Sequence, residues 1–99
     1  MSCCYILFSK KLGRFYFGAC HDDLDLRIEK HNNHAYGKHR YTATADDWEL
    51  YTKIDTHDFV HAVRIERKIK SMKSSKYIRN LTKYPDLVQK IIAETAPGT

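Results

Sequence analysis

The chain has 99 residues, of which 42% are hydrophobic and 29% charged, a composition that excludes disordered and fibrous classes. The length supports one compact domain over residues 1–99. No apolar run can span a bilayer, the N-terminus lacks a signal-peptide pattern, and three cysteines do not make a disulfide framework. We therefore expect a cytoplasmic protein with no membrane partner, whose net charge of +5 indicates an anionic partner.

The first two expected elements form a β-hairpin. Residues 3–9 and 14–20 are rich in aromatic and β-branched residues and flank the short turn sequence KKLG. Alternation along the strands places Tyr5 and Tyr16 on one face, with Gly18 beside them. The glycine leaves room either for a ligand close to the backbone or for a second core layer with tyrosine hydroxyls at its rim. The other face, which we expect to be core, carries Ile6, Phe8, Phe15 and Phe17.

A helix is expected next, over about residues 23–34, because Asp22 and Asp23 precede an apolar period. On this helix Arg27 and His31 are four residues apart, so their side chains lie on one face. Two cationic groups stacked in this way repel each other unless an anion lies beside them. The pair therefore indicates an anion-binding site close to the end of the hairpin.

The rest of the chain is expected to add a polar loop, one strand and three helices. The loop covers residues 36–47, the strand 48–54, a helix capped by Asp55 or Thr56 covers about 57–72, a short helix starts at Ser74 and Ser75, and the last runs from Tyr84 and Pro85 to near Glu94. The fold class is therefore α+β, with a small, mainly antiparallel three-stranded sheet flanked by helices. The order is ββαβα followed by short C-terminal helices.

One carboxylate falls close to the apolar side of the helix over 57–72. Glu66 lies roughly 40° from the centre of a cluster of apolar side chains on a helical wheel. A carboxylate that points inward needs a cation, a metal or hydrogen bonds. Glu66 is therefore either a functional acid or an edge residue that pairs with Lys70 one turn later. The apolar cluster consists of Phe59, Ala62, Ile65, Ile69 and Met72.

Residues 64–83 carry eight cations and one acid. Most charge runs are solvated helix faces, but apolar residues are interleaved here, so the segment belongs to the folded body. A patch of one sign on a folded body favours phosphates. The candidate nucleic-acid-binding residues of this segment are Lys68, Lys70, Lys73 and Lys76.

Five features, taken in order, resemble the GIY-YIG endonuclease superfamily, and in particular its small stand-alone bacterial members. They are Tyr5 in CCYIL, Tyr16 in YFG, Arg27 and His31 in DLDLRIEKH, Glu66 in RIERKIK, and Asn80 in KYIRNL. The resemblance covers residues 3 to about 83. Two departures are visible: Cys3-Cys4 replaces a Gly-Ile pair, and Ala19 stands where some relatives have a lysine.

The resemblance implies metal-dependent hydrolysis of DNA, double-stranded or branched, in repair or processing. It implies Tyr5 as the general base and one Mg²⁺ or Mn²⁺ ion on Glu66. Arg27 would bind phosphate oxygens and His31 would tune or relay the Tyr5 proton. Tyr16 would position water or phosphate, and Asn80 would support the site by hydrogen bonds. The alternative is a catalytically silent nucleic-acid-binding module with the same basic surface.

Two other groupings could suggest zinc. His57 and His61 are four residues apart on the helix over 57–72, but no second pair at ligand spacing accompanies them, so we expect surface histidines. Cys20-His21 could lie near Cys3-Cys4, but adjacent cysteines suit a tetrahedral site poorly. We therefore expect these cysteines to be small buried hydrophobes.

Overall fold

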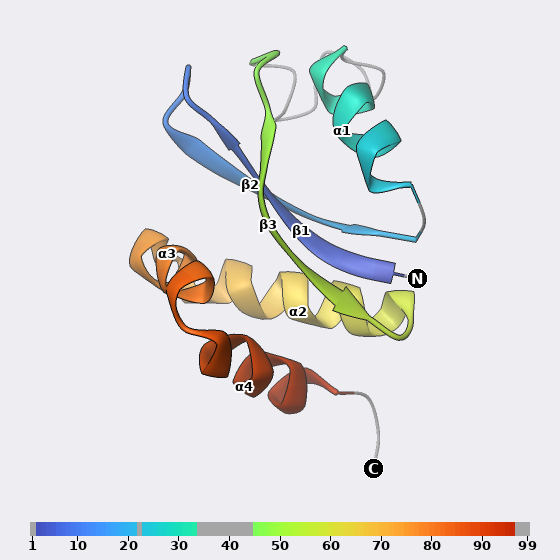
Figure 1. Cartoon of the computed structure of the whole chain (residues 1–99), viewed down its shortest axis with the longest axis vertical. Coiled ribbons are helices and arrows are strands. Elements are labelled where there is room, and N and C mark those ends of the chain that lie inside the picture. The colour runs from blue at the N-terminus through green and yellow to red at the C-terminus, as the bar shows by residue number, and fades with distance from the viewer. Residues whose placement is uncertain (1, 22, 34–44, 97–99) are drawn as a thin grey trace.

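The computed structural model describes residues 2–21, 23–33 and 45–96 (Figure 1). Its elements, in chain order, are β1 (Ser2–Ser9), β2 (Arg14–Cys20), α1 (Leu24–Asn32), β3 (Glu49–Thr56), α2 (Phe59–Met72), α3 (Ser75–Lys83) and α4 (Pro85–Thr95). The strands form one antiparallel sheet in the order β2-β1-β3. The α+β prediction is confirmed. Most of the polar loop predicted over 36–47 lies outside the described residues, and no described helix is long and apolar enough to cross a membrane.

The two faces of the hairpin are those predicted by alternation. β1 pairs with β2 so that Tyr5 lies opposite Gly18 and Leu7 opposite Tyr16. Tyr5, Leu7 and Tyr16 belong to one apolar cluster, together with Trp48. Side chains of the intervening residues, such as Ile6, belong to the other cluster. Each face of the sheet is therefore covered by its own core layer.

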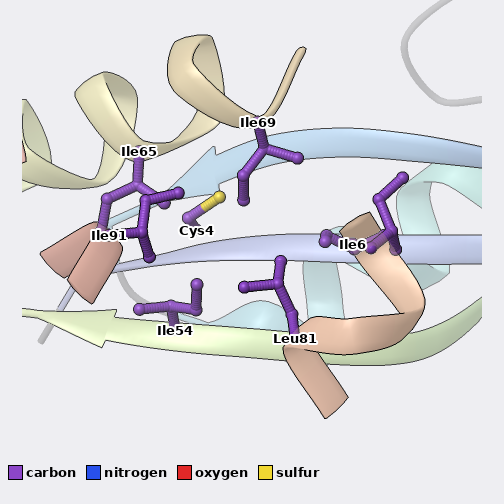
Figure 2. Packing of buried hydrophobic residues seen from close by; sticks show 8 residues of the cluster. Cys4, Ile6, Ile54, Ile65, Ile69, Leu81 and Ile91 are labelled. Carbon is purple, nitrogen blue, oxygen red and sulfur yellow. The ribbon is translucent and has the colours of Figure 1, made fainter. Parts of the chain in front are cut away.

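The larger core layer lies between the sheet and three helices, and we call this the α2 side. Figure 1 shows α2, α3 and α4 together below the sheet, with α1 apart from them. Figure 2 shows how side chains from both strands and helices meet there: Cys4 and Ile6 from β1, Ile54 from β3, Ile65 and Ile69 from α2, Leu81 from α3 and Ile91 from α4. On the other face, the α1 side, Leu24 and Ile28 of α1 pack against the cluster that contains Tyr5 and Trp48.

Two details of α2 differ from the prediction. The helix is capped by Asp58, whose side chain accepts a hydrogen bond from the His61 N–H at 2.8 Å, because β3 continues as far as Thr56. Met72, predicted to face the core, is 42% exposed. It is the last residue of α2 and lies beyond Ile69, at a cavity of about 220 Å³ that Tyr77 and Ile91 also line.

The two histidines of α2 and its preceding turn do not behave alike. His57 is exposed, as expected, but His61 is buried, so the prediction of a surface histidine is wrong there. Helix α4 covers it: His61 Nε2 lies 3.0 Å from the hydroxyl of Thr95 and 3.1 Å from the carbonyl oxygen of Ile92. The sequence spacing gave no sign of this contact, because it depends on packing between helices far apart in the chain.

All three cysteines are free and buried, as predicted. Burial raises the pKa of the Cys3 and Cys4 thiols, which keeps them protonated. Among the residues that the structure describes, no three His, Cys, Asp or Glu side chains come together in a way that could hold a metal. The described part of the chain therefore offers no zinc site of three or more such ligands.

The hairpin turn is held by Asp47, which precedes β3. The hydroxyl of Ser9 and the main-chain N–H of Lys11 donate hydrogen bonds to its carboxylate, at 2.5 and 3.0 Å. Gly13 completes the turn with a φ of +64°, in the left-handed region. These contacts fix the tip of the hairpin to the segment that leads into β3.

We expect Asp47 to stabilise the fold only above acid pH. The hydrogen bond from Ser9, followed by that from Lys11, holds the pKa of this carboxyl below its ordinary value, so the unfolded chain binds the proton more tightly. The stabilisation is therefore present above about pH 4 and is lost as the pH falls through the folded-state pKa. Asp47→Asn should lower Tm at pH 7, and the difference from wild type should shrink at about pH 3.

Thermal denaturation at the two pH values tests this expectation, with the exposed neighbour Asp46 changed to Asn as the matched control. A Tm difference for Asp47→Asn that is the same at both pH values would contradict the assignment.

Candidate active site

Tyr5 lies at the centre of the sheet, and its ring crosses the backbone of Gly18 on the neighbouring strand. A Cβ atom built at Gly18 would lie 2.4 Å from both Cζ and Oη of Tyr5, closer than any real contact. The space over the glycine is thus filled by the tyrosine ring, not left open for a ligand as the first interpretation required. Tyr5 is 1% exposed, which agrees with the second interpretation of a tyrosine in a core layer.

Two side chains from α1 reach the Tyr5 hydroxyl. Arg27 Nε donates a hydrogen bond to Tyr5 Oη at 3.2 Å, and His31 Nε2 lies 3.0 Å from the same oxygen. A guanidinium group only donates, so Oη accepts from Arg27 and its own proton is available to His31 Nε2 when that nitrogen carries none. Arg27 and His31 lie on one face as predicted, and the group that they share is a phenol.

Tyr16 completes this group from β2. Its ring centroid lies 4.9 Å from that of His31. We call Tyr5, Tyr16, Arg27 and His31 the phenol cluster. The residues come from three consecutive elements, β1, β2 and α1. Asp23 helps to fix α1 by accepting a hydrogen bond from Leu26 N at 3.0 Å. The fold thus brings together four of the six residues that the sequence proposed for catalysis.

The other two candidates lie on the opposite side of the sheet. Glu66 and Asn80 belong to α2 and α3, whose buried residues pack on the α2 side. The Asn80 main-chain carbonyl accepts a hydrogen bond from Tyr84 N at the end of α3. Within the described ranges, no hydrogen bond or ion pair joins either side chain to the phenol cluster. Four of the six residues thus form the phenol cluster, and the other two belong to helices that pack on the other face of the sheet.

Glu66 combines the two interpretations made from the sequence. Its side chain is only 17% exposed, and it forms an ion pair with Lys70 at 3.2 Å. Burial, followed by the charge of Glu66, raises the pKa of the Cys4 thiol, so the carboxylate lies close to Cys4. Cys4 precedes Tyr5 in β1 and faces the other way. Glu66 thus belongs to the helix that covers the face of Cys4, whereas the phenol cluster lies on the face of Tyr5.

The basic candidates are exposed and follow the helices of the α2 side. Lys68 lies 3.9 Å from Glu94 and Lys70 pairs with Glu66, so both are near acids. Lys73 ends α2 in a left-handed conformation, with a φ of +48°, and Lys76 is in the first turn of α3. These four lysines form part of the solvent surface of the domain.

Two residues near the cluster were not proposed from the sequence. Trp48 is 2% exposed and its ring centroid lies 6.2 Å from that of Tyr16. Asn32 makes two hydrogen bonds with the main chain of Trp48. A lone tryptophan is a large apolar side chain and could have been assigned to the core on that ground. Nothing in the sequence distinguishes Asn32 from a solvent-exposed residue at a helix end.

Residues 1–79 match the family model of the GIY-YIG catalytic domain. The chain belongs to the GIY-YIG family. Membership indicates endonuclease activity, with DNA as the substrate, and GIY-YIG nucleases generally depend on a divalent metal. Searches among curated proteins and among solved structures gave no significant match. The family match ends inside α3, so α4 lies beyond it.

Gly18→Ala should displace the Tyr5 ring, because the added methyl group and the phenol cannot occupy the same space. We expect DNA cleavage to fall by about 10²-fold, the scale of a misplaced catalytic group. Overpacking should also lower the free energy of unfolding by about 1–3 kcal/mol.

Gly13→Ala is the matched control, measured by the same cleavage assay and by denaturant unfolding. Its Cβ would meet nothing within 4 Å, and its positive φ should cost about 1 kcal/mol of stability with cleavage retained. Equal cleavage by the two variants would show that the contact between Gly18 and Tyr5 does not matter for activity.

Proposed function

We propose that the chain hydrolyses phosphodiester bonds of DNA and that the phenol cluster is the reacting site. The observation that carries this proposal is the shared Tyr5 oxygen, which lies 3.2 Å from a guanidinium nitrogen and 3.0 Å from an imidazole nitrogen. A positive charge beside a phenol favours the phenolate, and a neighbouring imidazole can take the phenol proton. The arrangement suits a tyrosine that acts as a general base near neutral pH.

The proposed reaction uses three groups of the cluster. Tyr5, after passing its own proton to His31, takes a proton from water as the water oxygen attacks phosphorus and the bond to the leaving oxygen breaks. The planar guanidinium of Arg27 matches phosphate oxygens and would offset the charge that builds on them. Since Tyr5 is buried, the partly buried Arg27 and Tyr16 are the groups that a phosphate meets first. Tyr16 would position the phosphate or the water.

Glu66 is the proposed residue for a divalent ion. Mg²⁺ and Mn²⁺ prefer oxygen ligands, and Mg²⁺ is often bound through one carboxylate while it keeps several waters, so a single partly covered glutamate fits such an ion. The ion pair with the Lys70 ammonium, at 3.2 Å, supports the proposal that a cation binds beside this carboxylate. When bound, the metal would supply charge stabilisation at the leaving oxygen. Asn80 is proposed to support this part of the site by hydrogen bonds.

The position of β2 suggests how one DNA strand could meet both parts. In the described sheet, β2 is an edge strand, and Gly18 and Ala19 lie opposite Tyr5 and Cys4. The phenol cluster lies on one face of these rows and Glu66 near the other face. A DNA backbone bound along the edge of β2 could therefore be contacted by both the phenol cluster and Glu66. The four lysines of α2 and α3 would extend the contact along double-stranded or branched DNA, in repair or processing.

A silent binding module is the weaker candidate. In such a protein the residues that carry the chemistry are free to change, yet Tyr5, Arg27 and Glu66 are all present in the matched segment.

Glu66→Gln should abolish metal-dependent cleavage, by about 10²-fold or more, while much of the DNA affinity remains, because it removes one charge and keeps the shape of the side chain. EDTA should have the same effect on wild type. Cleavage of supercoiled, linear and branched DNA with Mg²⁺ or Mn²⁺ provides the measurement. Glu94→Gln is the control, since Glu94 also pairs with a lysine of α2 but belongs to α4. Wild-type rates in Glu66→Gln would remove this residue from the site.

Tyr5→Phe should lower turnover by about 10² or more, the usual scale for the loss of a general base. The ring still fills the space over Gly18, so the fold should persist, at a cost of about 1–3 kcal/mol for the partners left without the hydroxyl. Tyr16→Phe should have a smaller effect on turnover.

Turnover is compared for the two tyrosine variants across pH, together with circular dichroism. If Tyr5→Phe unfolds, the hydroxyl has a structural role. If it cleaves like wild type with the same pH profile, the proton acceptor lies elsewhere, and His31 becomes the leading candidate.

A further inference from the structure

His31 reaches Tyr5 from the last turn of α1, a helix of nine residues. A helix of this length is not stable by itself, and its last turn is where it frays. The apolar contacts of α1 with the sheet come from Leu24 and Ile28, which are only partly buried. A contact at the C-terminal end of α1 would help to keep His31 at 3.0 Å from the Tyr5 hydroxyl.

The next residue, Asn32, makes a contact of this kind with the segment before β3. Its Oδ1 accepts a hydrogen bond from the main-chain N–H of Trp48 at 2.7 Å, and its Nδ2 donates one to the carbonyl oxygen of the same residue at 2.9 Å. A carboxamide offers both an acceptor and donors, so it satisfies both main-chain groups of Trp48. Aspartate has no donor at neutral pH, and alanine has neither group.

Trp48 is a firm attachment point for this pair of hydrogen bonds. It is buried, it directly precedes β3, and its indole packs in the cluster that contains Tyr5 and Tyr16. The two hydrogen bonds therefore connect the end of α1 to the core layer beneath the phenol cluster. His31 precedes Asn32 in the same helical turn, so a displacement of this turn would move the imidazole as well.

We propose that Asn32 is a positioning residue for the reaction: its carboxamide, held on the main chain of Trp48, keeps His31 within hydrogen-bond distance of Tyr5. Asn32 does not touch the reacting atoms and acts through His31. The effect on turnover rests on the proposed function, because it requires that Tyr5 and His31 act in cleavage. The effect on the imidazole does not.

The first test observes His31 directly in the full chain, by NMR of its imidazole nitrogens across pH. We expect the His31 signals of Asn32→Ala and Asn32→Asp to shift toward those of Tyr5→Phe, in which the hydrogen-bond partner is absent. Glu29→Gln, an exposed change on the same helix, is the control and should leave the signals unchanged. Wild-type His31 signals in both Asn32 variants would overturn the proposal.

The second test measures cleavage, well below the melting temperature of every variant, for wild type, Asn32→Ala, His31→Ala and the double variant. Asn32→Ala should lower kcat by about 10- to 100-fold with little change in KM. In the His31→Ala background the same change should have less than about a twofold effect, because both act on one group. If Asn32→Ala lowers kcat by the same factor in wild type and in His31→Ala, Asn32 does not act through His31. If wild type cleaves no DNA, the proposed function fails, and the His31 signals alone decide whether Asn32 positions the imidazole.

Discussion

The close approach of the Tyr5 ring to the backbone of Gly18 is the constraint on which the α1 side depends. With no side chain on Gly18, the phenol lies close to the neighbouring strand and its oxygen comes within reach of α1. Arg27 and His31 then meet at one oxygen atom, which accepts a hydrogen bond from the guanidinium and can donate its own proton to a neutral imidazole. The absence of a Cβ atom at Gly18 thus allows Tyr5 to take the position in which its hydroxyl meets Arg27 and His31.

The division of the molecule into two core layers explains why the site can be so closely packed. The α2 side has three helices and the larger set of aliphatic side chains, which suits it to provide most of the apolar burial. Among the described residues, the α1 side has one short helix and a layer that contains several aromatic side chains. The α1 side also accommodates a buried tyrosine, a buried histidine and a partly buried arginine, which are joined by hydrogen bonds.

How much could be predicted from the sequence depends on the range of the interaction. Alternation in the hairpin assigned Tyr5 and Tyr16 to one face, and helical spacing assigned Arg27 and His31 to one face, because both are local geometry. The burial of His61 by α4 and the exposure of Met72 depend on how helices far apart in the chain pack, which no local period contains. The hydrogen bonds of Asn32 to Trp48 depend on a contact between elements that are 16 residues apart. For Glu66, the helical wheel correctly indicated a position beside the apolar face of α2. It did not decide between a functional acid and an edge residue that pairs with Lys70.

Helix α4 lies outside the segment matched by the family model but is part of the packed core of this chain. The family match stops at residue 79, yet Ile91 of α4 is fully buried against Ile65 and Ile69, and Thr95 satisfies the buried His61. A fragment cut at the family boundary would end α3 early and would expose an aliphatic surface and an imidazole that the intact protein keeps from water. The end of the family match at residue 79 would therefore be a poor place to truncate this protein, because α4 covers apolar side chains of α2 that residues 1–79 alone would leave exposed.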